Sequence, residues 1–277
     1  GGCIPQEAAG SGVILRASRE WRLYFFMEKQ IYLRKSIRRY RNNDIGEAAL
    51  SVLASWRGWA DVYAQGADAD CDIQLLGSDA KLGGMYFIKA PHYIAYWGRP
   101  TREGRINAGF ILEQISLRLT ELGVGTCYLG ATHISGANPD ERGLEPIIIM
   151  SCGNPAEPLT RTSTSEFKRK RLDKICDAEL NEKMRAILES ARLAPSAMTR
   201  QPWQFAIEGG RIICCVEHSG LDAFRRLSEI DMGIVMSHIL LTARAQCGAA
   251  HIEHSQQDAL KAPRGTGYVA TIVTENL

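Results

Sequence analysis

Three polar residues near the start of the chain alternate in the order Arg34, Ser36 and Arg38. In an extended segment alternate side chains point to the same side, so these three could converge on one anion. Guanidinium groups offer rigid pairs of donors and a serine hydroxyl offers another, a set that suits a phosphate. Alone, the pattern favours an exposed basic strip, because Arg39 and Arg41 follow directly.

A second basic run, Lys168–Arg171, has two interpretations. It is typical of a solvated charge run or a nuclear-type basic patch. It could also supply a second arm to the phosphate that the first segment would bind.

Two segments next to helical patterns could let a ligand approach closely. Glycines in Gly123–Gly130 expose backbone N–H groups; a helix cap explains Gly123 but not Gly125 and Gly130. In the second segment, Ala194–Trp203, small side chains leave room for a flat ring and short polar side chains offer contacts. Trp203 and Phe205 are predicted to pack in the core.

Hydrophobic periodicity predicts the elements that position these segments. Helices are expected over residues 44–58, 106–122, 177–194 (with Asp177 as N-cap and Pro195 as the stop) and 231–247. Strands are expected within 72–98 (including 86–88), over 145–150, around 205–207, and over 211–216 and 267–274.

The order of helix, β pair, long helix and strand occurs twice. Asn107-Ala108-Gly109 in the first unit matches Asp231-Met232-Gly233 in the second, and each long helix is followed by a glycine, Gly123 or Gly248. We interpret the chain as a diverged tandem duplication of residues 27–165 and 166–277. The alternative is two unrelated α/β units whose helices and strands end at the same common residue types.

Together, the Arg34–Arg38 and Gly123–Gly130 segments, Cys152–Glu157, and Ala191–Ala197 with Gln201-Pro202-Trp203 resemble the FMN-dependent nitroreductase family. The resemblance covers about residues 30–277. It implies an α+β nitroreductase-like fold of mostly antiparallel sheets flanked by helices.

The order of the motifs resembles the tandem branch of that family. In ordinary members, the Arg-x-Ser-x-Arg segment and the glycine-rich turn come from one subunit of a homodimer, and the Pro-Ser-Ala…Gln-Pro-Trp segment comes from the other. Here the two sets fall in different repeats of one chain. One flavin site per chain is therefore expected, in a monomer that imitates a dimer.

The resemblance also implies roles for single residues. Arg34, Ser36, Arg169 and Lys170 would bind the FMN phosphate, and Arg38 would lie near the flavin N1/O2 edge. Backbone groups of Leu129 and Gly130 would lie near N5 and O4. The other repeat would contribute Pro195, Ser196, Ala197, Thr199 and Gln201. Met198 and Thr199 stand where the family usually has a small residue and Asn, and a hydroxyl has fewer donors than an amide.

The resemblance implies an FMN-dependent oxidoreductase. It would pass two electrons from NAD(P)H through flavin N5 to a small acceptor, such as a nitroaromatic or a quinone, by a ping-pong mechanism. The cofactor carries the chemistry, so no catalytic acid, base or metal is expected, and Arg38 would stabilise charge at N1. Alternatives are a flavin-binding storage or sensing protein, a specialised oxidase or dehalogenase of the same fold, and, more remotely, a nucleic-acid module built on Lys168–Arg171.

Composition narrows the class of protein. The 277 residues carry a formal net charge of +2, which disfavours nucleic-acid or membrane partners, and no apolar run approaches the ~20 residues of a membrane span. The eight cysteines lack CxxC spacing, so we expect no zinc, buried reduced thiols and a cytoplasmic protein. Residues 1–26 are expected to be an N-terminal extension or a translation artefact, since Met27 begins a normal start.

Overall fold

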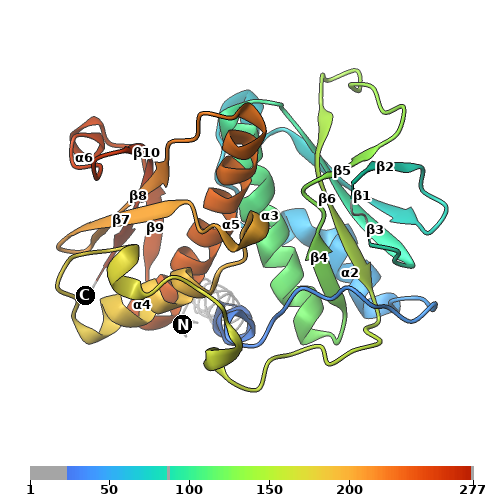
Figure 1. Cartoon of the computed structure of the whole chain (residues 1–277), viewed down its shortest axis with the longest axis horizontal. Helices are drawn as coiled ribbons and strands as arrows, with labels where there is room; N and C mark the ends of the chain where they lie inside the picture. Colours follow the sequence, from blue (N-terminus) through green and yellow to red (C-terminus); the bar gives the residue numbers. More distant parts are fainter. Residues whose placement is uncertain (1–23, 86–87, 276–277) are drawn as a thin grey trace, which may run out of the picture.

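Two long helices lie side by side at the centre of the molecule, α3 (Arg102–Glu121) and α5 (Asp222–Cys247), with one sheet on either side (Figure 1). The computed structural model describes residues 24–85 and 88–275. The first sheet contains β1 (Cys71–Gly77), β3 (His92–Gly98), β4 (Gly125–Tyr128) and β6 (Glu145–Gly153). The second contains β7 (Trp203–Glu208), β8 (Arg211–Glu217), β9 (Ala250–Glu253) and β10 (Thr266–Thr274). All neighbouring strands in both sheets are antiparallel.

The two sheets have the same topology. Their orders are β1-β3-β6-β4 and β7-β8-β10-β9. Numbered along the chain among the four strands of its own sheet, each order is first, second, fourth, third. A helix precedes each sheet in the chain: α2 (Glu47–Ser55) packs on α3, and α4 (Glu182–Leu193) packs on α5. The α+β architecture of antiparallel sheets and flanking helices is as predicted.

The central helices cross at Gly109 and Gly233, the two glycines at equivalent positions in the proposed repeats. A methyl group on Gly109 would lie 1.9 Å from the carbonyl oxygen of Ile230, and one on Gly233 would lie 1.9 Å from that of Ile106. Each contact is with the carbonyl three residues before the other glycine, so the crossing has a local two-fold arrangement. Any side chain at either position would force the backbones apart.

Equivalent polar residues beside these glycines fix equivalent loops. The Asn107 Oδ1 accepts hydrogen bonds from the N–H groups of Tyr63 and Ala64, at 3.0 and 3.3 Å. The Asp231 carboxyl accepts from the N–H of Ala197, at 3.1 Å to each oxygen. Each loop leads to the first strand of its own sheet.

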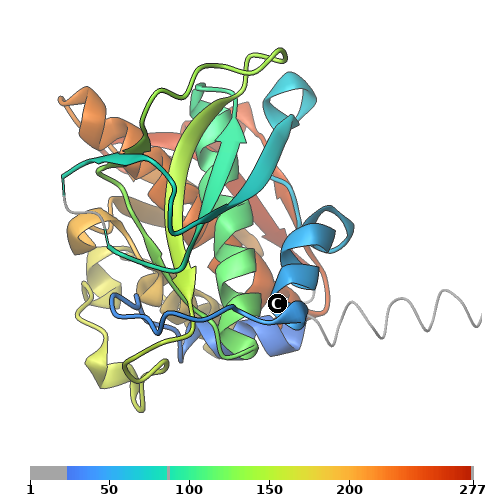
Figure 2. The ribbon, with the colours of Figure 1, turned by 90° about the vertical axis from the view of Figure 1, so that its right-hand side faces the viewer.

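The first half carries an addition on the outer face of its sheet. β2 (Leu82–Gly84) pairs with β5 (Thr132–Ile134), and this two-stranded sheet packs over Tyr93 and Ile149. Figure 2 views the molecule from this side, with the first sheet in front of α3. In the second half a tight turn at Gly209-Gly210 joins β7 to β8, and a short helix, α6 (Gln256–Ala259), lies between β9 and β10.

The predicted start of α4 is wrong. The N-cap is Asn181, whose side chain accepts from the N–H of Met184 at 2.8 Å, and not Asp177. Leu180 packs against the core from an irregular segment. Because it lies four residues before Met184, its position imitates a first helical turn.

The predicted start of α5 is also wrong, since the helix begins nine residues before Asp231. The extra turns carry apolar residues at helical spacing, Ala223, Leu227 and Ile230, which line one cavity. Ion pairs between residues four positions apart stabilise the exposed side of the same turns. Arg226 lies 2.7 Å from Asp222, and Arg225 lies 3.0 Å from Glu229.

Of the expected strand at 86–88, residues 86–87 lie outside the described part of the chain, and Ile88 is not in a strand.

The core confirms several simpler predictions. Trp203 and Phe205 are fully buried. The seven cysteines within the described residues are buried and free, whereas Cys3 lies outside them.

Of the N-terminal region expected to be an extension, residues 1–23 lie outside the described part, and a helix over residues 24–31 buries Met27. In the described ranges, no helix combines the length and the apolar character needed to cross a membrane.

Candidate anion and flavin site

Arg34 is the buried member of the predicted anion-binding triplet. The residue is 3% exposed, and its Nη1 lies 3.7 Å from Glu113 Oε1. Among the described residues, its Nε and Nη2 atoms have no hydrogen-bond partner. Buried guanidinium donors without partners are costly, so this side chain is well suited to bind an anion.

Two further arginines lie within electrostatic range of Arg34. The guanidinium carbons of Arg161 and Arg169 lie 3.9 and 5.6 Å from the centroid of the Phe167 ring. Burial, followed by the charges of Arg161 and Arg34, lowers the pKa of Arg169 to about 10. Burial and then Arg34 also lower the pKa of Arg161. These side chains form a cluster of mutually repelling positive charges, which we call the arginine cluster (Arg34, Arg161 and Arg169).

The basic run links the arginine cluster to the Pro195–Gln201 loop. Arg169 Nε donates to the carbonyl oxygens of Leu193 and Ala194, at 3.3 and 3.1 Å. Arg169 therefore connects the C-terminus of α4 to the cluster. Lys170 Nζ instead lies 3.0 Å from Glu217 Oε1 and donates to the Gln201 carbonyl oxygen at 2.9 Å.

Ser36 and Arg38 continue outward from Arg34 along an extended segment. Ser36 is half-buried and forms a parallel bridge with Thr126 in β4. Arg38 is exposed; its backbone N–H donates to Glu157 Oε1 at 2.7 Å, and its Nη1 donates to the Ser36 carbonyl oxygen at 3.4 Å. Within the triplet, burial thus decreases from Arg34 to Arg38.

The loop after α4 is strained. Met198, Thr199 and Gln201 have φ angles of 51°, 60° and 50°, in the left-handed region that costs a non-glycine residue roughly 1–3 kcal/mol. Such strain concentrates at ligand-binding loops. Met198 is 69% exposed at the tip of the loop, and Thr199 is also exposed.

Gln201 fixes this strained conformation. Its buried side chain accepts from the N–H of Lys170 at 2.5 Å and donates to the carbonyl oxygen of Arg192 at 2.9 Å. Its own N–H donates to the Ser196 hydroxyl at 2.9 Å. Gln201 and Ser196 therefore shape the loop from within, while Pro195 and Ala197 are half-buried beside them.

The buried carboxyl of Asp231 holds the same loop. Burial raises the pKa of Asp231 to about 8, although the N–H of Ala197 and the charge of Arg200 act in the opposite direction. Asp231 is therefore mostly protonated at neutral pH, and it still accepts from Ala197.

The glycine-rich segment lies at the end of β4. The Leu129 N–H donates to the Ile149 carbonyl oxygen at 2.9 Å, and the Leu129 carbonyl accepts from Thr132 at 3.1 Å. Both Leu129 backbone groups are thus used within the protein. Gly130 borders a cavity of about 260 Å³ beside Ile148 and Leu227, where α5 begins.

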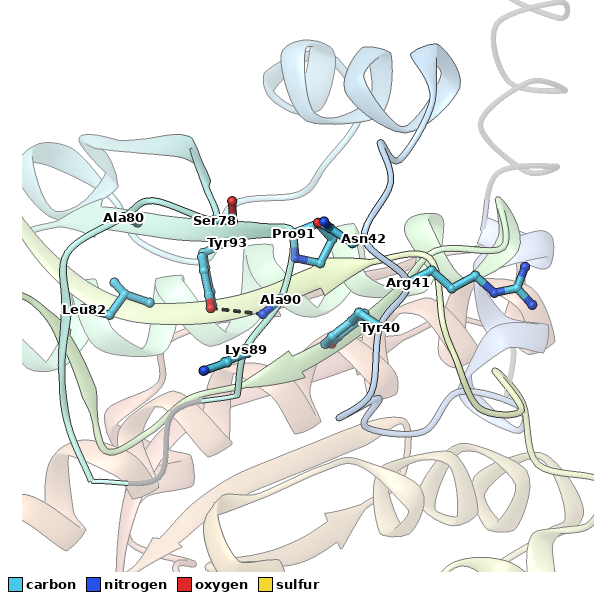
Figure 3. A pocket seen from close by; sticks show the side chains of 10 residues that line it. All are labelled: Tyr40, Arg41, Asn42, Ser78, Ala80, Leu82, Lys89, Ala90, Pro91 and Tyr93. Carbon is cyan, nitrogen blue, oxygen red and sulfur yellow. Dashed lines mark hydrogen bonds between the residues drawn. The ribbon is translucent and has the colours of Figure 1, made fainter.

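A larger cavity, of about 490 Å³, lies elsewhere and contains none of the predicted site residues. Tyr40, Pro91 and Tyr93 contribute to its wall, and the Tyr93 hydroxyl accepts from the N–H of Ala90 at 3.1 Å (Figure 3). In Figure 3 the Arg41 side chain extends away from the other labelled residues.

Sequence reasoning missed a buried polar network between the two halves. His238 Nε2 on α5 lies 3.0 Å from Glu113 Oε1 on α3, and the Tyr128 hydroxyl donates to Glu113 Oε2 at 3.0 Å. Glu113 and His238 are fully buried. Burial would raise the pKa of Glu113, but the Arg34 charge and the hydrogen bonds from His238 and Tyr128 hold it below its usual range. In the sequence, the signals for this network are Glu113 and His238 themselves, which lie among the apolar residues of two predicted helices.

The fold is an α+β fold of two antiparallel sheets around two central helices, and it holds a buried cluster of arginines. The family described as "Putative TM nitroreductase" matches residues 27–243. The chain belongs to this family and is thus a nitroreductase-family oxidoreductase.

Three similar solved structures are reported, of which the first shares this fold. A nitroreductase from Thermotoga maritima MSB8, named as putative, is 24% identical, with a TM-score of 0.61 over 89% of this chain and 93% of that chain. A nitroreductase family protein from Clostridium difficile 630 is 20% identical, with a TM-score of 0.43 over 56% of this chain and 99% of that chain. One from Desulfovibrio desulfuricans, in complex with FMN, is 18% identical, with a TM-score of 0.40 over 64% and 99%. No curated protein matches the chain.

Proposed function

We propose that this protein is an FMN-binding oxidoreductase of the nitroreductase type. It would pass two electrons from NAD(P)H to a small acceptor, such as a nitroaromatic or a quinone, in a ping-pong cycle. The observation that carries the proposal is Arg34, which is buried beside Arg161 and Arg169 and has two donor atoms without a partner among residues 24–85 and 88–275.

The charges of this region fit a flavin that bears a phosphate. The three guanidinium groups of the arginine cluster lie within electrostatic range of two carboxylates, the buried Glu113 and the exposed Glu166, which leaves a net positive charge. A phosphate monoester carries about −1.5 to −2 charges at pH 7. A bound phosphate would accept hydrogen bonds from the Arg34 donors and would reduce the repulsion between the arginines.

The bound flavin would supply the electron transfer, and the protein would bind and orient it. Arg34 and Arg169 would hold the phosphate, with the Ser36 hydroxyl nearby. The exposed Arg38 would place its charge at the N1/O2 edge, where negative charge develops on reduction. The Pro195–Gln201 loop would form the second wall, at the other end of Arg169.

We also propose that the two halves are diverged copies, residues 27–165 and 166–277, which together imitate a dimer in a monomeric chain. Three observations support this proposal. The sheets share one strand order, the central helices cross reciprocally at Gly109 and Gly233, and Asn107 and Asp231 fix equivalent loops.

A flavin-binding protein without reductase activity is the second candidate. The exposed Met198 and the strained Thr199 favour it, because they replace the usual small residue and Asn at the second wall. Oxidation of NADH or NADPH by the flavin-loaded protein with a quinone acceptor separates the two candidates. The reductase predicts turnover, and the storage or sensing protein predicts none.

An absorption spectrum of the purified protein, followed by FMN titration, tests cofactor binding. We expect a yellow protein, or one that takes up added FMN, and we expect the double variant Arg34→Ala/Arg38→Ala to lose the flavin. A colourless wild-type protein that takes up no FMN would overturn the proposal.

A further inference from the structure

The buried network around Glu113 lies directly behind the proposed phosphate site. Of the carboxylates in the described part of the chain, Glu113 is the one paired with Arg34. Its Oε1 faces both Arg34 Nη1, at 3.7 Å, and His238 Nε2, at 3.0 Å. Its Oε2 accepts from Tyr128 at 3.0 Å. The carboxylate is therefore contacted by three groups, two at Oε1 and one at Oε2.

The network reaches the second half of the chain through His238. The Nδ1 atom of His238 lies 2.9 Å from the carbonyl oxygen of Ser190, on α4. That oxygen can only accept, and a Glu113 carboxylate oxygen at Nε2 also accepts, so a proton on each ring nitrogen satisfies both contacts. Glu113 is then fixed by donors from β4 and α5, and α5 is tied to α4.

A buried ion pair of this kind is a poor source of stability. Desolvation offsets most of the attraction between buried charges, and apolar residues of similar volume often serve stability as well or better. The network does, however, fix the position of one particular group. Arg34 Nη1 points to Glu113, which leaves Nε and Nη2 without partners in the described residues.

We propose that Glu113 is a positioning residue for phosphate recognition. Held by His238 and Tyr128, it fixes the Arg34 guanidinium so that Nε and Nη2 face the phosphate of the flavin. His238, in the second half of the chain, thereby helps to orient the phosphate-binding Arg34 in the first half. This inference rests on the proposed FMN binding and adds the source of its selectivity for a phosphorylated flavin.

The ratio of the dissociation constants of riboflavin and FMN tests the inference, because the two ligands differ only in the phosphate. Both are measured by quenching of flavin fluorescence. Glu113→Gln keeps the side-chain shape and removes the charge that orients Arg34. We expect it to weaken FMN binding about tenfold or more, which corresponds to about 1.4 kcal/mol, and to change riboflavin binding less than about twofold.

Two further variants make the test specific. Glu121→Gln is the matched control, since Glu121 is on the same helix but pairs with Arg118 at the surface, and it should leave the ratio unchanged. In an Arg34→Ala background, Glu113→Gln should no longer alter the ratio, because the group that it positions is absent.

The outcomes separate the inference from the proposed function. If the wild-type protein binds no FMN, the proposed function fails and the inference fails with it. If the wild type prefers FMN and Arg34→Ala abolishes the preference but Glu113→Gln keeps it, the inference alone is overturned. Should Glu113→Gln not fold, Tyr128→Phe decides: a reduced ratio supports the inference, and an unchanged ratio overturns it.

Discussion

Replacing Asp231 with Asn should remove a pH-dependent loss of stability. Asp231 is 5% exposed, and burial raises its pKa to about 8, whereas the carboxyl in the unfolded chain titrates near its ordinary value of 3.8. Between these values the folded protein holds a proton that the unfolded chain releases. The stabilisation is therefore complete below about pH 4 and is lost as the pH rises through about 8.

The size of the effect follows from linkage. One proton corresponds to about 1.4 kcal/mol per pH unit, so between pH 5 and pH 8 the wild type should lose up to about 4 kcal/mol through this group. An Asn at position 231 does not titrate. Its amide oxygen can still accept from the N–H of Ala197, as Asn107 does from Tyr63 at the equivalent place.

Urea unfolding of both proteins at pH 5 and pH 8 measures the effect. We expect the free energy of unfolding of Asp231→Asn, relative to the wild type, to rise by several kcal/mol between the two pH values. Asp173→Asn is the control, because the Asp173 side chain is exposed and pairs only with Arg171 in the described residues. A difference between wild type and Asp231→Asn that is the same at both pH values would refute the reasoning.

Two further substitutions test the helix crossing and the strained loop. Gly233→Ala should destabilise the protein by about 3 kcal/mol or more in urea unfolding, because the methyl group would meet the backbone oxygen of Ile106 at 1.9 Å; Gly220→Ala, with open space at its Cβ, should have little effect, and equal effects would count against the crossing. Met198→Gly should raise the melting temperature, with a gain of about 1 kcal/mol, since Met198 has a φ of 51° and is 69% exposed; a lower melting temperature would show that the side chain stabilises the loop.

Much of the fold follows from local pattern. The helix at 106–122, the strands at 145–150 and 211–216, and the matched glycines at 109 and 233 are where periodicity and the internal repeat place them. These positions are predictable because their side chains face one continuous core. The prediction for α5 began too late, at Asp231, although Ala223, Leu227 and Ile230 continue the helical spacing of apolar residues toward the N-terminus.

The candidate site was predictable only in part. Arg34 and Arg169 lie in motifs, and the structure brings them within electrostatic range of each other. Arg161 lies in a connector without a pattern. Glu113 and His238 are separated by 125 positions, and each is one of several polar residues in its helix. Their pairing depends on how α3 and α5 cross, which local sequence does not specify.

Titration of Arg34→Ala with FMN and riboflavin tests the central claim most directly. Losing hydrogen bonds between a charged donor and a phosphate costs about 1.5–3 kcal/mol. We therefore expect FMN binding to weaken roughly 10- to 150-fold relative to the wild type, with riboflavin binding nearly unchanged. Arg39→Ala, in the same segment but with a 74% exposed side chain, should bind FMN like the wild type. Equal affinity of Arg34→Ala and the wild type for FMN would contradict the assignment of Arg34 to the phosphate.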